Sequence, residues 1–207
     1  MSLFTLIRWI LIVGSIVAIV IVANRSKKRA VTLTIGFAIL VGVIAIDIQY
    51  PAENDFTSFK TIEQAFSYSN TGEIIHRIDG SKSGLIIYQD DETIGLCFLP
   101  KTEKNRWKIS SLFSFDTVYN NKGVTIKNTD YSISVFRVKK TDDYYLVLDA
   151  WFVDEKPIVS DNESSNFECV ERVYGKTRKK SYSFYVYVES IDTYELYING
   201  EKVDINN

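Results

Sequence analysis

Residues Phe4–Ala23 read FTLIRWILIVGSIVAIVIVA, and residues Ala30–Ile48 read AVTLTIGFAILVGVIAIDI. The only charged residues in these two stretches are Arg8 and Asp47. A helix rises about 1.5 Å per residue, so each stretch forms a helix of about 30 Å, the thickness of the hydrocarbon core of a bilayer. The sequence therefore predicts a transmembrane hairpin in residues 1–50, with helices at about 4–23 and 30–48.

A cleaved signal peptide is the alternative interpretation of the first stretch. Ile21-Val22-Ala23 is a poor small-residue cleavage site, and a second apolar stretch follows within ten residues. These two features favour a retained helix.

The orientation follows from the connection Asn24-Arg25-Ser26-Lys27-Lys28-Arg29, which holds four positive charges. The flank after the second helix, Pro51-Ala52-Glu53-Asn54-Asp55, holds none. Because cytoplasmic loops are enriched in Lys and Arg, we expect the connection in the cytoplasm and both termini outside. We therefore predict a cell-membrane protein with two spans and an extracytoplasmic C-terminal domain.

Arg8 and Asp47 lie at similar distances from the centre of this connection, near the outer interface. Two interpretations stay open: a transmembrane ion pair between Arg8 and Asp47, or two side chains that each reach the headgroups alone. Trp9 and Tyr50 lie close by and fit an interfacial aromatic belt.

Small residues lie at similar depths in the two predicted membrane helices: Gly14 and Ala18 in the first, and Ala38 and Gly42 in the second. This spacing lets helix backbones approach closely. We expect these residues to pack the hairpin on itself; docking of a partner helix is the alternative.

Residues 51–207 alternate between apolar and polar residues as β-strands do, and predict one mainly-β (β-rich α+β) domain. A short helix should begin after Thr61, because Gln64 stands at the capping-box position and Ile62, Ala65 and Phe66 share one face. The predicted hairpins and strands are 84–88 with 93–99, 131–138 with 144–153, 181–188, and 194–203 around Asn199-Gly200. Two of these strands carry apolar rows on one face, which are Tyr144, Leu146, Leu148, Ala150 and Phe152 in the strand at 144–153 and Tyr182, Phe184, Val186 and Val188 in the strand at 181–188.

The segments between these strands are assigned from their composition. Pro51–Thr57 is interpreted as a polar exit linker, and Asn120–Lys127 and Val159–Asn166 as loops. Trp107-Lys108-Ile109 is expected to open a further strand.

Net charge limits the partners. Residues 1–50 hold five of the 24 basic residues and one of the 26 acidic residues, so the remainder has a net charge of −6. An acidic domain repels polyanions, and we predict no nucleic-acid binding.

Chemical motifs are weak throughout the chain. His76 is the only histidine, and no metal-ligand spacing surrounds it. The acidic pairs, Asp142-Asp143 among them, fall where solvated turns are expected and do not match a calcium loop. We predict no catalytic, cofactor-binding or metal-binding residues.

Two cysteines, Cys97 and Cys169, leave two alternatives. They form one disulfide on the outer side of the membrane, or they are ordinary thiols packed in a core. We favour the thiols.

Tyrosine and phenylalanine are abundant, at 13 and 12 residues. Tyr185, Tyr187 and Tyr197 fall on the strand faces opposite the apolar rows and form a candidate interaction surface if those faces are exposed. In the alternative, a second layer covers both faces.

The order of membrane anchor, short helix, β-meander with Arg106-Trp107-Lys108-Ile109, and closing segment Tyr197–Val203 resembles uncharacterised membrane-anchored extracytoplasmic proteins of Gram-positive bacteria. The similarity is one of pattern, and it implies a bacterial cell envelope as the setting. It transfers no functional residues.

Together these features predict a membrane-anchored protein, not an enzyme, whose β domain is an interaction or binding module at the cell envelope. Its partners would be the lipid bilayer and another membrane or envelope protein. Two alternatives remain: an accessory or immunity-type protein that acts through its helices, and an extracytoplasmic envelope enzyme.

Overall fold

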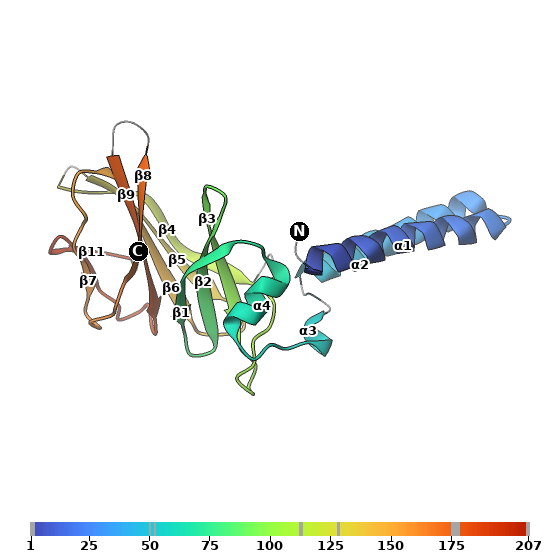
Figure 1. Cartoon of the computed structure of the whole chain (residues 1–207), viewed down its shortest axis with the longest axis horizontal. Coiled ribbons are helices and arrows are strands. Elements are labelled where there is room, and N and C mark those ends of the chain that lie inside the picture. Colours follow the sequence, from blue (N-terminus) through green and yellow to red (C-terminus); the bar gives the residue numbers. More distant parts are fainter. Residues whose placement is uncertain are drawn as a thin grey trace. The chain divides into compact units, whose positions relative to one another are not determined.

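The computed structural model describes residues 3–49, 51, 53–111, 114–127, 129–174 and 179–205 (Figure 1). The chain divides into two compact units. The first comprises Met1–Ile74 and Tyr88–Ser114, and the second comprises Ile75–Ile87 and Phe115–Asn207. Helices dominate the first unit and strands dominate the second.

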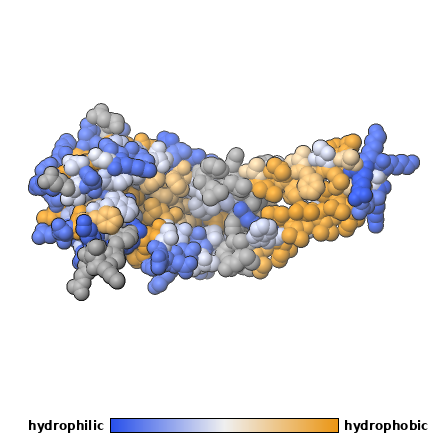
Figure 2. All heavy atoms as spheres, turned by 90° about the horizontal axis from the view of Figure 1, so that it is seen from above, coloured by the Kyte–Doolittle hydropathy of each residue, from blue (hydrophilic) through white to orange (hydrophobic). Residues whose placement is uncertain are grey.

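Two apolar helices begin the first unit, α1 (Leu3–Arg25) and α2 (Arg29–Gln49). The stretch Arg8–Arg25 of α1 is long and apolar enough to cross a membrane, whereas the apolar part of α2 within the described residues, Arg29–Ala45, is shorter. The helices are hydrophobic along their length, and their connecting end is hydrophilic (Figure 2).

The two helices pack through a narrow seam. The less exposed residues of α1 include Ile12, Ser15 and Ile19, and those of α2 include Gly36 and Leu40. Their spacing of three and four residues places each set on one helical face. A Cβ atom built on Gly36 would lie 2.7 Å from Cγ2 of Ile19, so the seam needs glycine at this position.

The other small residues lie outside this seam. Among the described residues, nothing lies within 4 Å of a Cβ atom built on Gly14 or on Gly42. The prediction that these glycines pack the hairpin on itself is therefore wrong. The physical reason is that the seam follows Ile12, Ser15 and Ile19, which turns Gly14 away from α2.

The helix α4 (Ile62–Ser69) begins after Thr61 as predicted, but the Gln64 side chain reaches the residue before the N-cap and not the N-cap itself. The Thr61 hydroxyl accepts a hydrogen bond from the Gln64 backbone N–H at 3.3 Å, and the Gln64 side chain accepts one from the Lys60 N–H at 3.2 Å. Ile62, Ala65 and Phe66 are buried, as their shared face requires.

The segment after α2 is not a free linker. It contains the single turn α3 (Glu53–Phe56), and the backbone of Phe59 pairs with that of Trp107 through two hydrogen bonds of 2.9 Å. The predicted strand at residues 107–109 is wrong, because Trp107 makes only isolated bridges there and the side chain of Asn54 binds the backbone of Ile109.

The described residues contain eleven strands in three sheets, in the orders β1-β2-β3, β11-β10-β7 and β4-β5-β6-β9-β8. The predicted hairpin partners are neighbours in these sheets, and the pairs β5–β6 and β10–β11 are antiparallel. The strands are β1 (Glu73–Asp79), β2 (Ser83–Asp90), β3 (Thr93–Pro100), β4 (Phe115–Ile126), β5 (Thr129–Val138), β6 (Tyr144–Val153), β7 (Val159–Asp161), β8 (Glu168–Tyr174), β9 (Lys179–Val188), β10 (Leu196–Ile198) and β11 (Glu201–Val203).

Two predicted loops contain strand. Residues 120–126 belong to β4, and residues 159–161 form β7. In the described chain β4 is an edge strand of the five-stranded sheet, most of its side chains are at least partly exposed, and two register shifts interrupt its pairing with β5. Polar residues and irregular pairing are common on exposed edge strands. Because residues 120–126 lack a regular apolar alternation, the sequence pattern predicted a loop there.

The core of the second unit lies on one face of the five-stranded sheet. Leu146, Leu148 and Ala150 of β6 pack there with Phe184 of β9, and Leu196 and Ile198 of β10 belong to the same cluster. The predicted apolar row of β6, up to Ala150, and that of β9 therefore face the core. The remaining members of this cluster include Tyr131, Ile133, Val135, Tyr182, Val186, Val188, Tyr194, Val203 and Ile205.

Candidate interaction surface

A β-bulge near the end of β6 moves Phe152 out of the core, beside the outward-facing Trp151. Ala150 pairs with Tyr182 and Val153 pairs with Lys180, so Trp151 and Phe152 together oppose the single residue Ser181. Phe152 has a φ of 55°, in the left-handed region. Trp151 is 42% exposed and Phe152 is 53% exposed, whereas Val153 returns to the core.

The sequence predicted Phe152 as the last member of the apolar row of β6, and the bulge makes this wrong. A bulge inserts one extra residue and so ends the alternation of faces. We call Trp151 and Phe152 the aromatic bulge.

A polar row lies beside the aromatic bulge, on the sheet face opposite the core. The Ser183 hydroxyl donates to Asp149 at 2.5 Å and accepts from a guanidinium nitrogen of Arg172 at 3.2 Å. The guanidinium carbon of Arg172 also lies 5.9 Å from the ring centre of Trp151. Arg172 thus links the polar row to the aromatic bulge through a hydrogen bond and a cation–π contact.

Burial shifts the ionisation of this row. Desolvation raises the pKa of Asp149, and the hydrogen bond from Ser183 and the positive charge of Arg172 oppose that rise. Burial also raises the pKa of the neighbouring Tyr185 to about 12. The row therefore places a carboxyl group with a raised pKa and a guanidinium beside two exposed aromatic rings.

The three tyrosines proposed as a surface lie in different environments. Tyr185 is 2% exposed and offers no contact area, so the structure removes it from that surface. Tyr187 is half-buried and donates a hydrogen bond to Asp143 at 3.3 Å. Tyr197 is half-buried and donates to Glu195 at 2.5 Å.

Asp143 is buried, so the prediction of a solvated turn at this residue is wrong. Its carboxylate accepts hydrogen bonds from the hydroxyls of Ser81 and Ser83 and from the backbone N–H of Lys82, at 2.9, 2.6 and 2.8 Å. With the bond from Tyr187, each carboxylate oxygen accepts two hydrogen bonds. A carboxylate satisfied in this way fastens the β1–β2 turn to the five-stranded sheet and has no free lone pair for catalysis.

His76 has a partner that its sequence neighbourhood does not reveal. Its Nδ1 atom lies 2.8 Å from a carboxylate oxygen of Glu168 on β8, and both side chains are half-buried. The pair ties β1 to the outer strand of the five-stranded sheet, which is a structural use of the only histidine.

The cysteines are free thiols: Cys97 is buried and Cys169 is half-buried. Desolvation raises the pKa of Cys97 to about 12, which removes its reactivity at neutral pH.

Arg8 is half-buried, but the side chain of Asp47 lies outside the described residues, as does Tyr50. The ion pair of Arg8 with Asp47 stays a prediction.

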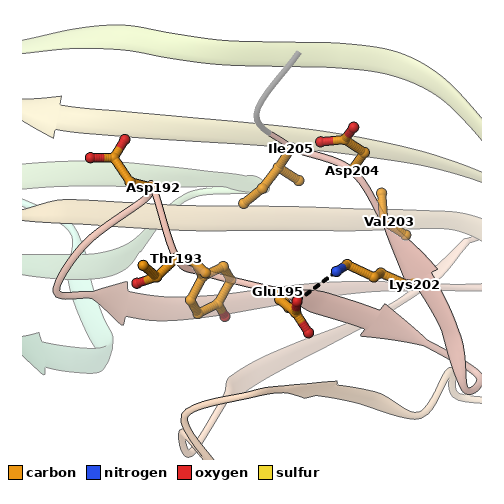
Figure 3. Close-up of a pocket in the computed structure, with 8 residues that line it drawn as sticks. Asp192, Thr193, Glu195, Lys202, Val203, Asp204 and Ile205 are labelled. Carbon is orange, nitrogen blue, oxygen red and sulfur yellow. Dashed lines mark hydrogen bonds and ion pairs between the residues drawn. The ribbon is translucent and has the colours of Figure 1, made fainter.

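An open cavity of about 450 Å³ lies near the C-terminal end of the described chain (Figure 3). Two of its charged lining residues pair with each other, with the Lys202 ammonium 2.6 Å from a Glu195 carboxylate oxygen. The cavity is lined by Asp192, Thr193, Tyr194, Glu195, Lys202, Val203, Asp204 and Ile205. Within the described residues, no three His, Cys, Asp or Glu side chains are grouped so as to hold a metal ion.

No protein-family model matches the chain, and no curated protein or solved structure is significantly similar to it.

The sequence pattern predicted tyrosines as the surface aromatics and missed Trp151, Phe152 and Arg172. The available signal was the position of Trp151, which alternation places on the outward face of a strand whose other face is core.

Proposed function

We propose that this chain is a membrane-anchored binding protein of a bacterial cell envelope. In this proposal α1 and α2 span the membrane as a hairpin, and the β strands form an extracytoplasmic module that binds a protein partner. The exposure of α1 carries the proposal, because only 6% of its residues from Arg8 to Arg25 are buried within the chain.

An exposed apolar helix needs an apolar environment. A core helix of a water-soluble protein with this composition buries most of its residues, whereas lipid contact explains a helix that is apolar on every side. The basic connection supports an inward-facing loop. A signal sequence has a similar composition, and retention of both helices is therefore part of what must be tested.

The aromatic bulge supports the binding role. Trp, Tyr and Arg dominate the energetics of protein interfaces, and the bulge combines Trp151 and Phe152 with the guanidinium of Arg172. Tethering next to a membrane raises the effective concentration of a membrane-bound partner, so a modest interface is sufficient.

The first experiment places a photoreactive amino acid at residue 151 of the full chain in intact cells. Residue 158 is the matched control, because Ile158 is 73% exposed but lies outside the aromatic bulge. We expect one recurrent adduct from residue 151 and none of that mass from residue 158. Equal adduct patterns at the two residues would show that the aromatic bulge is not a specific surface.

A membrane-impermeant amine reagent tests the orientation in the same cells. Lysines of the β domain should be modified, while an internal cytoplasmic protein stays unmodified. Protection of the β domain in cells whose other surface proteins react would place the module in the cytoplasm.

A second candidate function is an accessory or immunity-type protein that acts through its helices. The open space at Gly14 and Gly42 favours it, because small residues facing outward let another helix approach closely. Exchange of α1 and α2 for an unrelated two-helix anchor separates the two candidates. The binding-module proposal expects the adduct at residue 151 to persist, and the accessory role expects the cellular function to disappear.

A further inference from the structure

The segment that follows the membrane helices is fastened to the β3–β4 connection. The Asn54 side chain pairs with both backbone groups of Ile109: its Oδ1 accepts from the N–H at 2.9 Å and its Nδ2 donates to the carbonyl at 3.1 Å. Asn54 thus replaces a strand partner, and it is buried.

Further contacts fix the rest of this segment. The Lys108 ammonium donates to the carbonyls of Asn54 and Thr57, and the latter bond measures 2.9 Å. The Arg106 side chain binds the hydroxyl and the carbonyl of Ser58 at 2.9 and 2.5 Å. We call residues 54–59, held in this way by residues 106–109, the collar.

One side chain of the collar points away from all of these contacts. Phe56 is 89% exposed, more than any other large apolar residue in the described chain. A single exposed apolar residue is common, but Phe56 lies between Asn54 and Thr57, whose carbonyls both accept hydrogen bonds from Lys108.

The collar also lies close to the end of the apolar helices along the chain. Phe56 follows Gln49, the last residue of α2, by seven residues. Seven residues reach at most about 25 Å, and part of this stretch is the compact turn α3. Trp9, near the start of α1, is also exposed, and aromatic side chains concentrate where the hydrocarbon core meets the headgroups.

We infer that Phe56 inserts into the interfacial layer of the membrane and that the collar holds it there. This inference rests on the proposed membrane anchoring of α1 and α2. The ligand is the phospholipid surface at the level of the headgroups and upper acyl chains. Asp55 is exposed beside Phe56 and keeps the collar at this depth, since a carboxylate does not enter the hydrocarbon core.

The test uses the full chain in phospholipid vesicles with an environment-sensitive fluorophore on an introduced cysteine. Cys169→Ser removes the half-buried thiol, and Cys97 stays unlabelled because it is buried. Probes are placed by Phe56→Cys, by Val17→Cys within α1, and by Ile158→Cys as an exposed control. Nitroxide lipids labelled at the headgroup or deep in the acyl chain serve as quenchers.

We expect the probe at residue 56 to shift to the blue and to lose more fluorescence with the headgroup quencher than with the deep quencher. The probe at residue 17 should respond most to the deep quencher, and the probe at residue 158 to neither. Equal responses at residues 56 and 158, with residue 17 quenched, would overturn the inference and leave the anchor intact. No quenching at residue 17 would overturn the anchor and the inference together.

Asn54→Ala in the chain labelled at residue 56 tests the role of the collar. Loss of the Asn54 side chain should free the segment and reduce quenching by the headgroup lipid. Unchanged quenching would show that the collar does not position Phe56. Circular dichroism of the Asn54→Ala chain, compared with its parent, separates local release from unfolding.

Discussion

The α1–α2 hairpin and the five-stranded sheet use the same aliphatic residues in opposite ways. In the sheet, Leu146, Leu148 and Val186 are buried, and the edge strand β4 is largely exposed and polar. In the hairpin, Val13, Val17 and many similar residues are exposed, and the seam includes Ser15. The difference teaches that the sheet is stabilised by exclusion of water from its aliphatic side chains, whereas the hairpin leaves most of its aliphatic side chains exposed.

The largest effect on the free energy of unfolding is expected in the buried core of the five-stranded sheet. Leu148→Ala should lower the free energy of unfolding of the β domain by about 2–5 kcal/mol, because Leu148 is fully buried and leaves a cavity. Denaturant unfolding of the full chain in nanodiscs, followed by near-ultraviolet circular dichroism, measures the loss. Val118→Ala on the exposed side of β4 is the control and should stay within about 0.5 kcal/mol. Equal losses would break the contrast between core and edge.

The next effect concerns the hairpin. Val17→Lys should raise the apparent free energy of insertion of α1 by about 3 kcal/mol, since a charge near the helix centre is costly in lipid. A translocon insertion assay measures this cost, and Val17→Leu should insert like the parent helix. Full insertion of the lysine variant would argue against a lipid environment for α1.

One substitution on the seam and one on the outward face of the hairpin can show which of the two faces carries the α1–α2 packing. Gly36→Val should disturb the α1–α2 packing at a cost of about 1–3 kcal/mol, because its side chain meets Ile19. Gly42→Val should leave the hairpin intact, since open space surrounds it. Crosslinking between cysteines placed on α1 and α2 reports the packing. Damage from the Gly42 variant and none from the Gly36 variant would reverse the assignment of the two faces.

The smallest effect is a pH dependence within the sheet. The pKa of Asp149 is raised in the folded state, so the folded chain binds its proton more tightly and loses stability as pH rises above the ordinary carboxyl pKa of about 3.9. Asp149→Asn cannot ionise and should be more stable than the parent at neutral pH, with the difference fading near pH 4.

Thermal unfolding at both pH values measures this difference. Ser183→Ala is the complementary variant, because it removes a hydrogen bond to the ionised carboxylate and should destabilise the chain more at neutral pH than at low pH. A gain for Asp149→Asn that is the same at both pH values would exclude ionisation as its cause.

Local signals made part of this fold predictable. Thr61 and Gln64 are three residues apart and determine where α4 begins, and Asn199-Gly200 adopts the positive φ values of its tight hairpin. Alternation alone identified the buried row of β9. Each of these features depends on neighbours in sequence or on one strand face.

The features missed depend on residues far apart in the chain. By its sequence neighbourhood Asn54 belongs to a linker, but its side chain binds the backbone of Ile109. Asp143 lies in a predicted solvated turn, but its carboxylate accepts hydrogen bonds from Ser81 and Ser83. Tyr185 lies on the outward face of its strand by alternation, yet it is 2% exposed. In each case contacts between distant segments decide burial.

By itself the sequence determined the two apolar helices, the basic connection between them and the mainly-β character of the rest, because these follow from local composition and periodicity. Tertiary structure alone decided which helix faces meet, where β6 bulges to expose Phe152 beside Trp151, and how Asn54 holds the segment that carries the exposed Phe56. The physical reason is that periodicity decides which residues share one face of a helix or strand, whereas close packing between distant elements decides which face is covered.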